Sequence, residues 1–184
     1  MRVVRLCSSS ETRADILDEF GIKFIQSSVD FDEETLSYQE PRAFVYYASL
    51  GKLGVAEAKF GLEYPILTAD TVISSGGKIL RKAKSKDEAR EILLAQSGSK
   101  ASIITSLHLK SKEFYFIDLS STDYQFSEFD RDDLEQYLES NLWQGKAGAC
   151  MVEGFCKKYI QSVKGFESCA KGLSVEKILP WIKG

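Results

Sequence analysis

The sequence predicts an α/β protein in which a mixed, twisted β-sheet is flanked by helices. Two kinds of pattern support this fold class. Short apolar runs typical of strands occur along the whole chain, and stretches with the 3.6-residue period of helices lie between them. The two kinds do not alternate strictly, so we expect a mixed sheet with helices packed against it.

The amino-terminal part begins with an apolar strand at residues 3–6 that runs into three serines, Ser8 to Ser10. A helix follows, with Ala14, Leu17 and Phe20 at three-residue spacing and Gly21 as its stop. A second strand at 22–25 then leads into the acidic stretch 30–34.

Pro41 is expected to open a long helix with an apolar stripe that extends to Ala58. Gly51 and Gly54 each weaken that prediction by about 1 kcal/mol. The remaining expected elements are a strand at 65–73, a hairpin return at 79–80, a helix around 89–93, strands at 103–109 and 114–126, a helix after Asp130, short strands at 149–152 and 159–163, and a helix at 174–182.

Composition indicates an ordinary globular protein. The 184 residues suit one domain spanning 1–184, and they are 43% hydrophobic and 28% charged. A net charge of −3 argues against broad attachment to nucleic acid or to a membrane surface, although local cations could still hold a small anionic substrate. The chain lacks an apolar run long enough for a signal peptide, so we expect a cytoplasmic protein with its four cysteines reduced.

Familiar phosphate and metal motifs are absent from the sequence, including the P-loop, G-x-G-x-x-G and H-E-x-x-H patterns. The single histidine, His108, alternates with Leu107 and Leu109 in a strand pattern, and we expect it to face the surface.

The serines Ser8 to Ser10, with Arg13, lie at an expected strand-to-helix junction. Free backbone N–H groups and the helix dipole favour a phosphate at such a junction. A serine-rich turn is more often only a helix cap, so this feature alone leaves both interpretations open.

Asp70 lies within an apolar strand, where an ionised carboxylate needs a metal, a lysine or hydrogen bonds. It is a candidate metal ligand or general base, and a solvent-facing strand end is the alternative. The acidic stretch 30–34 could lend a second carboxylate or be ordinary surface. Lys52, Lys82 and Lys146 recur at element ends, although isolated lysines are usually solvated.

Taken in order, these features resemble the Maf family of nucleotide pyrophosphatases. The matching segments are Ser8 to Arg13, Asp32-Glu33, Tyr47 to Lys52, Ala69-Asp70-Thr71-Val72, Arg81-Lys82-Ala83, Thr105, Gly145 to Cys150, Glu153-Gly154 and Gly172-Leu173. The family's Pro-Arg in the first motif is Glu11-Thr12 here, and Ala83 replaces the proline after the lysine.

The resemblance implies a Maf-like or inosine-triphosphate-pyrophosphatase-like fold with a cleft between two lobes, and a hydrolase that splits nucleoside triphosphates into monophosphate and pyrophosphate. It implies a divalent cation, Mg²⁺ or Mn²⁺, held by Asp70 and Glu33. Asp70 would also be the proton acceptor. Lys52 and Lys82 would stabilise charge on the phosphates.

By the same resemblance, Ser8, Ser10 and Arg13 would bind the phosphate tail. Thr71, Lys146 and Glu153 would lie toward the base and sugar. Thr71 is typical of a branch acting on dTTP and UTP, whereas Glu153 is typical of a branch acting on 7-methyl-GTP. We therefore expect pyrimidine or modified nucleotides as substrates, in a housecleaning or cell-division role, and a homodimer.

Three alternatives stay open. The first is a non-catalytic nucleotide-binding regulator of cell division or septum formation. The second is a phosphatase that releases the γ-phosphate, and the third is the related inosine-triphosphate pyrophosphatase family with a different base choice. Pyrophosphate release from a panel of triphosphates distinguishes the first from an enzyme.

Overall fold

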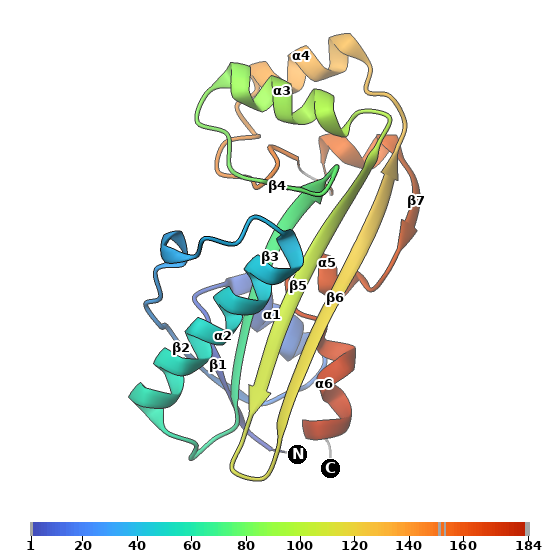
Figure 1. The fold of residues 1–184 in the computed structure, drawn as a ribbon. Coiled ribbons are helices and arrows are strands. Elements are labelled where there is room, and N and C mark those ends of the chain that lie inside the picture. Colours follow the sequence, from blue (N-terminus) through green and yellow to red (C-terminus); the bar gives the residue numbers. More distant parts are fainter. Residues whose placement is uncertain (1, 151, 153, 183–184) are drawn as a thin grey trace. The chain divides into compact units, whose positions relative to one another are not determined.

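A computed structural model describes residues 2–150, 152 and 154–182 (Figure 1). Its strands are β1 (Val4–Cys7), β2 (Phe24–Ser27), β3 (Ile66–Ser75), β4 (Lys78–Leu80), β5 (Lys100–Lys110), β6 (Tyr115–Phe126) and β7 (Ile160–Lys164). Its α-helices are α1 (Glu11–Glu19), α2 (Pro41–Phe60), α3 (Lys86–Gln96), α4 (Arg131–Glu139), α5 (Glu167–Ala170) and α6 (Val175–Ile182). Two short 3-10 helices, η1 (Glu33–Thr35) and η2 (Phe155–Tyr159), complete the described elements.

The seven strands form one mixed sheet, which confirms the predicted fold class. The strand order is β2-β1-β3-β5-β6-β7, with β4 paired to β3. β1 runs parallel to both β2 and β3, whereas the β3–β4 and β6–β7 pairs are antiparallel. Antiparallel neighbours can be joined by a short turn without a helix between them, which explains why strands and helices do not alternate strictly in the sequence.

The chain divides into two compact units. Unit 1 comprises residues 1–71, 104–121 and 166–184, and unit 2 comprises residues 72–103 and 122–165. The unit boundaries fall inside the long strands β3, β5 and β6. The prediction of a single domain, and of a cleft between lobes, stays a prediction.

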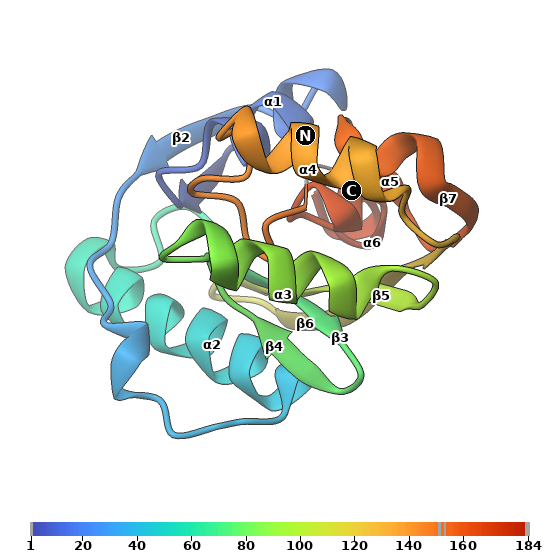
Figure 2. The same cartoon turned by 90° about the horizontal axis from the view of Figure 1, so that it is seen from above.

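Unit 1 packs helices on both faces of its strands. Side chains of β1 and β3 alternate, so that Leu6 and Leu67 pack with α1 and α6, while Cys7 and Ile66 pack with Leu53 of α2. Figure 2 shows α2 on one side of these strands and α6 on the other. The apolar residues that recur with the strand and helix periods of the sequence therefore form two cores, one on each face of these strands.

Unit 2 has a core that is rich in aromatic rings. Phe155 stacks on Tyr137 with ring centroids 4.5 Å apart, and Phe129 packs against both Phe155 and Tyr159. Helices α3 and α4 lie side by side in both ribbon views (Figures 1 and 2). A two-point ion pair links them, from Arg90 to the Glu135 carboxylate.

Two sequence-based expectations are wrong. His108 is fully buried, because the α2 side of β5 is covered: its ring packs against Tyr46 of α2 and lies 2.7 Å from the Tyr115 hydroxyl. The described residues of the stretch 149–152 form a turn and not a strand, since Gly148 and Ala149 have φ angles of 63° and 50° that extended backbone does not adopt.

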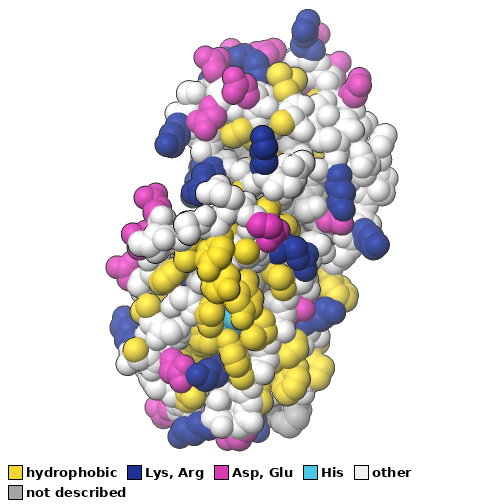
Figure 3. Space-filling model, viewed as in Figure 1, with side chains coloured by type: hydrophobic (Ala, Val, Ile, Leu, Met, Phe, Trp, Pro, Cys, Tyr) yellow, Lys and Arg dark blue, Asp and Glu magenta, His cyan; other side chains and the backbone are white. Residues whose placement is uncertain are grey.

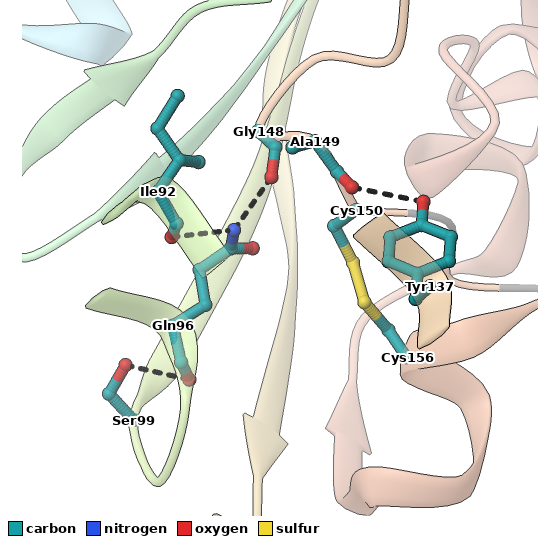
Figure 4. The surroundings of a disulfide bond; sticks show 8 residues. All are labelled: Ile92, Gln96, Ser99, Tyr137, Gly148, Ala149, Cys150 and Cys156. Carbon is teal, nitrogen blue, oxygen red and sulfur yellow. Dashed lines mark hydrogen bonds between the residues drawn. A yellow bond between two sulfur atoms is a disulfide. The ribbon is translucent and has the colours of Figure 1, made fainter. Parts of the chain in front are cut away.

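The expectation of four reduced cysteines is also wrong. Cys150 and Cys156 form a disulfide, whereas Cys7 and Cys169 are free and buried (Figure 4). The turn before Cys150 explains the pairing, because it returns the chain toward η2 and leaves the two Cα atoms 6.3 Å apart. Tyr137 donates a hydrogen bond to the Ala149 carbonyl and holds the same turn.

Figure 3 shows hydrophobic side chains gathered on one face of unit 1, over α2 and β6. Aromatic contacts connect this area: Tyr38 stacks on Tyr47, Tyr47 meets Tyr46, and His108 lies between Tyr46 and Tyr115.

Among the described helices, none has the length and apolar character that crossing a membrane requires.

Candidate active site

The serine turn joins β1 to α1 and lines a pocket in unit 1. Ser10 caps α1, since its hydroxyl accepts a hydrogen bond from the Arg13 backbone N–H at 3.4 Å. The Ser8 hydroxyl accepts from the Ser10 N–H at 3.2 Å, and the Gln26 amide donates to the Ser8 carbonyl at 2.9 Å. The turn is therefore fixed by its own side chains and by β2.

The pocket has a volume of about 180 Å³ and combines hydroxyls with cations. Its lining residues are Cys7, Ser8, Ser9, Ser10, Arg13, Val29 and Lys52. Hydroxyl groups, the start of a helix, a guanidinium and an ammonium are together suited to an anion such as a phosphate group. The sequence predicted this pairing of the serine turn with Arg13, and unit 1 brings Lys52 to the same pocket.

Three hydrogen bonds fix the Arg13 guanidinium. Its Nε donates to the Gly172 carbonyl at 2.8 Å, one Nη donates to the Ser8 hydroxyl at 3.1 Å, and the other donates to the Thr71 hydroxyl at 3.2 Å. Burial lowers the pKa of Arg13, and the nearby Asp70 and Glu33 carboxylates partly offset that effect. The guanidinium is thus a partly desolvated cation held in one orientation.

Asp70 and Glu33 share one ammonium group. The Lys52 Nζ lies 2.6 Å from an Asp70 oxygen and 2.5 Å from a Glu33 oxygen. Only 8% of the Asp70 side chain is exposed, compared with 39% for Glu33. The predicted carboxylates and the predicted lysine therefore converge, and Glu33 forms the open side of the cluster.

Burial raises the pKa of Asp70 to about 6, against the opposing effect of the Lys52 ammonium and with a smaller contribution from the Glu33 charge. A carboxyl group in this range is ionised near neutral pH and is more basic than an ordinary aspartate. Asp70 can therefore accept a proton at physiological pH, which is what a general base requires.

Local packing explains how Glu33 reaches Lys52. The Phe31 ring lies directly on Gly51 of α2: a Cβ at Gly51 would come within 2.2 Å of the ring. Asp32 then caps η1 by accepting a hydrogen bond from the Glu34 N–H, and η1 begins at Glu33. The missing side chain at Gly51 lets the acidic segment approach the helix.

The donor set of this cluster fits a hard divalent cation. The Asp70 and Glu33 carboxylates each direct an oxygen atom at the Lys52 ammonium that lies between them, and Mg²⁺ is commonly held by one or two carboxylates together with substrate phosphates and water. The part of the chain that the structure describes contains no cluster of three or more His, Cys, Asp or Glu side chains suited to a metal. Glu33 and Asp70 are thus candidate ligands for such a cation.

Unit 2 contains two further predicted residues. Lys82 pairs with Ala147 in an isolated antiparallel bridge, and the Gly148 N–H donates to the Arg81 carbonyl at 3.1 Å. The segments that carry Lys82 and Lys146 therefore lie next to each other within this unit. Glu153 lies outside the described residues.

Sequence reasoning did not assign a role to three residues of this region. Gln26 holds the serine turn, the Thr105 hydroxyl contacts the Thr71 hydroxyl at 2.9 Å, and Gly172 supplies the carbonyl that binds Arg13. Thr105 and Gly172 matched expected motif positions, which was the only available signal for them. Gln26 follows no motif, and only the β1–β2 pairing places it beside the serines.

Comparisons with known proteins match the chain over nearly its whole length. A family model described as "Maf-like protein" matches residues 3–184. A nucleoside triphosphate pyrophosphatase of a Nitratiruptor species is 56% identical over 178 residues, which cover 96% of each chain. Proteins with the same name from Helicobacter pylori and Campylobacter jejuni are 43% and 36% identical; the matches cover 97% and 96% of this chain, and 94% and 98% of the relatives.

Proposed function

This chain belongs to the Maf-like family, and from that premise we propose that it is a metal-dependent nucleoside triphosphate pyrophosphatase. Water attacks the α-phosphorus, the α–β phosphoanhydride bond breaks, and the products are a nucleoside monophosphate and pyrophosphate. One observation carries the proposal: in unit 1 the Lys52 ammonium joins Asp70 and Glu33 and also lines the pocket of the serine turn.

Asp70 is proposed as the base that accepts a proton from the attacking water. Its raised pKa supports that role, because a more basic carboxylate is a better proton acceptor and is still ionised near pH 7. Glu33 and Asp70 would hold Mg²⁺ or Mn²⁺, which when bound neutralises charge on the triphosphate oxygens.

The cations of the pocket are proposed to bind the phosphates. Arg13 can offer a fixed guanidinium to phosphoryl oxygens, and the Lys52 ammonium can stabilise charge that develops on them. Ser8 and Ser10 place hydroxyls and backbone N–H groups at the start of α1. Lys82 of unit 2 is proposed as a further cation for the leaving pyrophosphate.

The nucleotide base is proposed to be a pyrimidine or a modified base, in keeping with the family positions Thr71, Lys146 and Glu153. The proposed cellular role is removal of unwanted nucleotides, with cell division as the process affected. A cytoplasmic location and a homodimeric state belong to the same proposal.

A product-resolved assay tests the proposed function. The purified protein is incubated with dTTP, UTP, the purine triphosphates and 7-methyl-GTP, with Mg²⁺, with Mn²⁺ or with EDTA, and the products are separated by chromatography. We expect equal amounts of monophosphate and pyrophosphate with either metal and none with EDTA. Diphosphate plus phosphate would identify a γ-phosphatase instead. Silence across the whole panel by a folded sample would favour the non-catalytic regulator.

A further inference from the structure

The orientation of Arg13 depends on a chain of side-chain hydroxyls on the face of β3 opposite Asp70. Side chains alternate along a strand, so Asp70 faces α2, whereas its neighbour Thr71 faces α1 and α6. Thr71 meets Arg13 there, at 3.2 Å from one Nη. The residue beside the candidate base therefore contacts the guanidinium and not the carboxylate cluster.

Hydrogen-bond chemistry fixes the direction of this chain. The Thr105 hydroxyl lies 2.9 Å from the Cys169 backbone carbonyl, which can only accept, so Thr105 donates its single proton there. At its 2.9 Å contact with Thr71, Thr105 must then accept, and Thr71 must donate. The Thr71 oxygen consequently keeps a lone pair for the Arg13 N–H.

Burial makes the arrangement specific. Thr105 is fully buried, so its hydroxyl does not exchange its protein partners for bulk water. The Cys169 carbonyl comes from α5, and the Gly172 carbonyl that accepts from the Arg13 Nε lies three residues later. The same short segment thus holds the guanidinium directly at Nε and indirectly, through two hydroxyls, at Nη.

Gly172 is suited to this close approach. Its φ angle is +99°, and a Cβ would lie 3.3 Å from both the Arg13 Nε and the Thr71 hydroxyl oxygen. A side chain at this position would press on both groups that meet there. At this φ angle a side chain would be strained, and Arg13 and Thr71 would have to shift by a few tenths of an ångström, so glycine is favoured at this position.

We propose that Thr105 is a positioning residue that acts through Thr71 to orient the Arg13 guanidinium for phosphate binding. The proposal rests on the proposed function, in which Arg13 contacts the triphosphate. Within this chain of hydroxyls, the Thr71 hydroxyl donates to Thr105 and accepts from Arg13.

The test is a double-mutant cycle with Thr105→Val and Arg13→Ala. Thr105→Val should lower kcat/KM by about 10-fold to 100-fold, mainly through KM, and by the same factor for dTTP, UTP and purine triphosphates. Thr105→Ser keeps the hydroxyl and should stay within about threefold of the wild type. In the Arg13→Ala background, Thr105→Val should change kcat/KM by less than about twofold, because the guanidinium that it positions is gone.

Two results would overturn the proposal. One is a full effect of Thr105→Val in the Arg13→Ala background, since that would mean that Thr105 acts independently of Arg13. The other is a change in the ranking of nucleotide bases in Thr105→Val, since a guanidinium that binds the phosphates contributes equally to all nucleotides. If Thr105→Val fails to fold, Thr71→Val takes its place in the same cycle, with Thr71→Ser as its matched control.

Binding of inorganic pyrophosphate, measured by calorimetry, separates this inference from the proposed function. Thr105→Val should weaken pyrophosphate binding by about 10-fold or more relative to the wild type, and Thr105→Ser should not. If the wild type hydrolyses no triphosphate but Thr105→Val binds pyrophosphate more weakly than Thr105→Ser, the proposed function is contradicted and the role of Thr105 is supported. If the wild type hydrolyses triphosphates but Thr105→Val binds pyrophosphate as tightly as the wild type, the role of Thr105 is contradicted and the proposed function is supported.

Discussion

The Lys52 ammonium and the Asp70 carboxylate lie 2.6 Å apart, and the same ammonium reaches Glu33 at 2.5 Å. A buried carboxylate is thereby kept next to a cation, yet burial still raises the pKa of Asp70 to about 6. Carboxyl groups with a raised pKa are common in active sites, and we therefore propose this pair as the centre of the site.

Replacing Asp70 by asparagine should abolish most activity. Asp70→Asn keeps the shape of the side chain but removes the proton acceptor and one oxygen ligand with its charge, so kcat should fall by about 100-fold or more. Initial rates of pyrophosphate release measure the effect. Asp15→Asn, an exposed acid on α1, is the matched control. Near-normal turnover of Asp70→Asn would mean that the base lies elsewhere.

Glycines in α2 offer a test of the acidic segment. Gly51→Ala would place a methyl group against the Phe31 ring and displace the segment that carries Glu33. We expect the Mg²⁺ concentration for half-maximal activity to rise several-fold.

Gly54 is the matched control, because the space around its Cβ position is open. Gly54→Ala should leave the metal dependence unchanged and stabilise the helix by about 0.5–1 kcal/mol. Identical metal titrations for both variants would contradict the role assigned to Phe31 and Gly51.

Lys82 should contribute to catalysis and not to folding. Lys82→Ala is expected to lower kcat/KM by about tenfold, because one cation that stabilises phosphate charge is lost. Its free energy of unfolding should stay within about 0.5 kcal/mol of the wild type, since the side chain is exposed. Lys84→Ala, two residues away and also exposed, should alter neither quantity. Equal kinetics for the two variants would remove Lys82 from the site.

His108 should make the protein sensitive to acid. Burial lowers the pKa of His108 from 6.5 to about 4. Between these two pH values, His108 therefore binds a proton in the unfolded chain but stays neutral in the folded protein. Stability from the neutral histidine is complete above pH 6.5 and is lost as the pH falls toward 4, by about 1.4 kcal/mol per pH unit.

The comparison is between the wild type and His108→Gln, measured by urea unfolding between pH 7.5 and pH 4.5. Glutamine does not take up a proton, so the difference in unfolding free energy between the two proteins should depend on pH in this window. Asp70 also titrates there, but it is present in both proteins and cancels from the difference. Parallel stability curves would show that His108 takes up its proton at the same pH in the folded protein as in the unfolded chain, which would contradict the lowered pKa.

The disulfide between Cys150 and Cys156 should stabilise unit 2. Closing a loop with a sequence separation of 6 restricts the unfolded chain, which corresponds to about 2 kcal/mol. Reduction by dithiothreitol should lower the unfolding free energy by that amount. The Cys150→Ser, Cys156→Ser double variant should start lower and show no further change with the reductant. A reductant effect of equal size in the double variant would assign it to another group.

Much of the fold could be predicted because apolar residues recur in the sequence at the spacings typical of helices and strands. Each long helix carries an apolar stripe, and apolar residues recur along β3, β5 and β6. The two-residue period also placed His108 on the correct face of its strand. The period does not tell whether that face is covered by another element, so the conclusion that His108 is exposed was wrong.

Site residues could be predicted singly, whereas their contacts could not. Asp70 stands out because a carboxylate in an apolar strand is costly, and the serine turn with Arg13 has the chemistry of a phosphate site. The approach of Glu33 to Lys52 depends on a ring packed against Gly51, and the role of Thr105 depends on strand neighbours far apart in the sequence. Contacts of this kind arise from tertiary packing, which local patterns do not encode.

Hydrolysis in water enriched in ¹⁸O tests the central claim most directly. Attack on the α-phosphorus transfers the water oxygen to the nucleoside monophosphate, so mass spectrometry should find one ¹⁸O atom in the monophosphate and none in the pyrophosphate. Label in pyrophosphate would mean attack on the β-phosphorus, and label in inorganic phosphate would mean attack on the γ-phosphorus. Either result would contradict the proposed reaction.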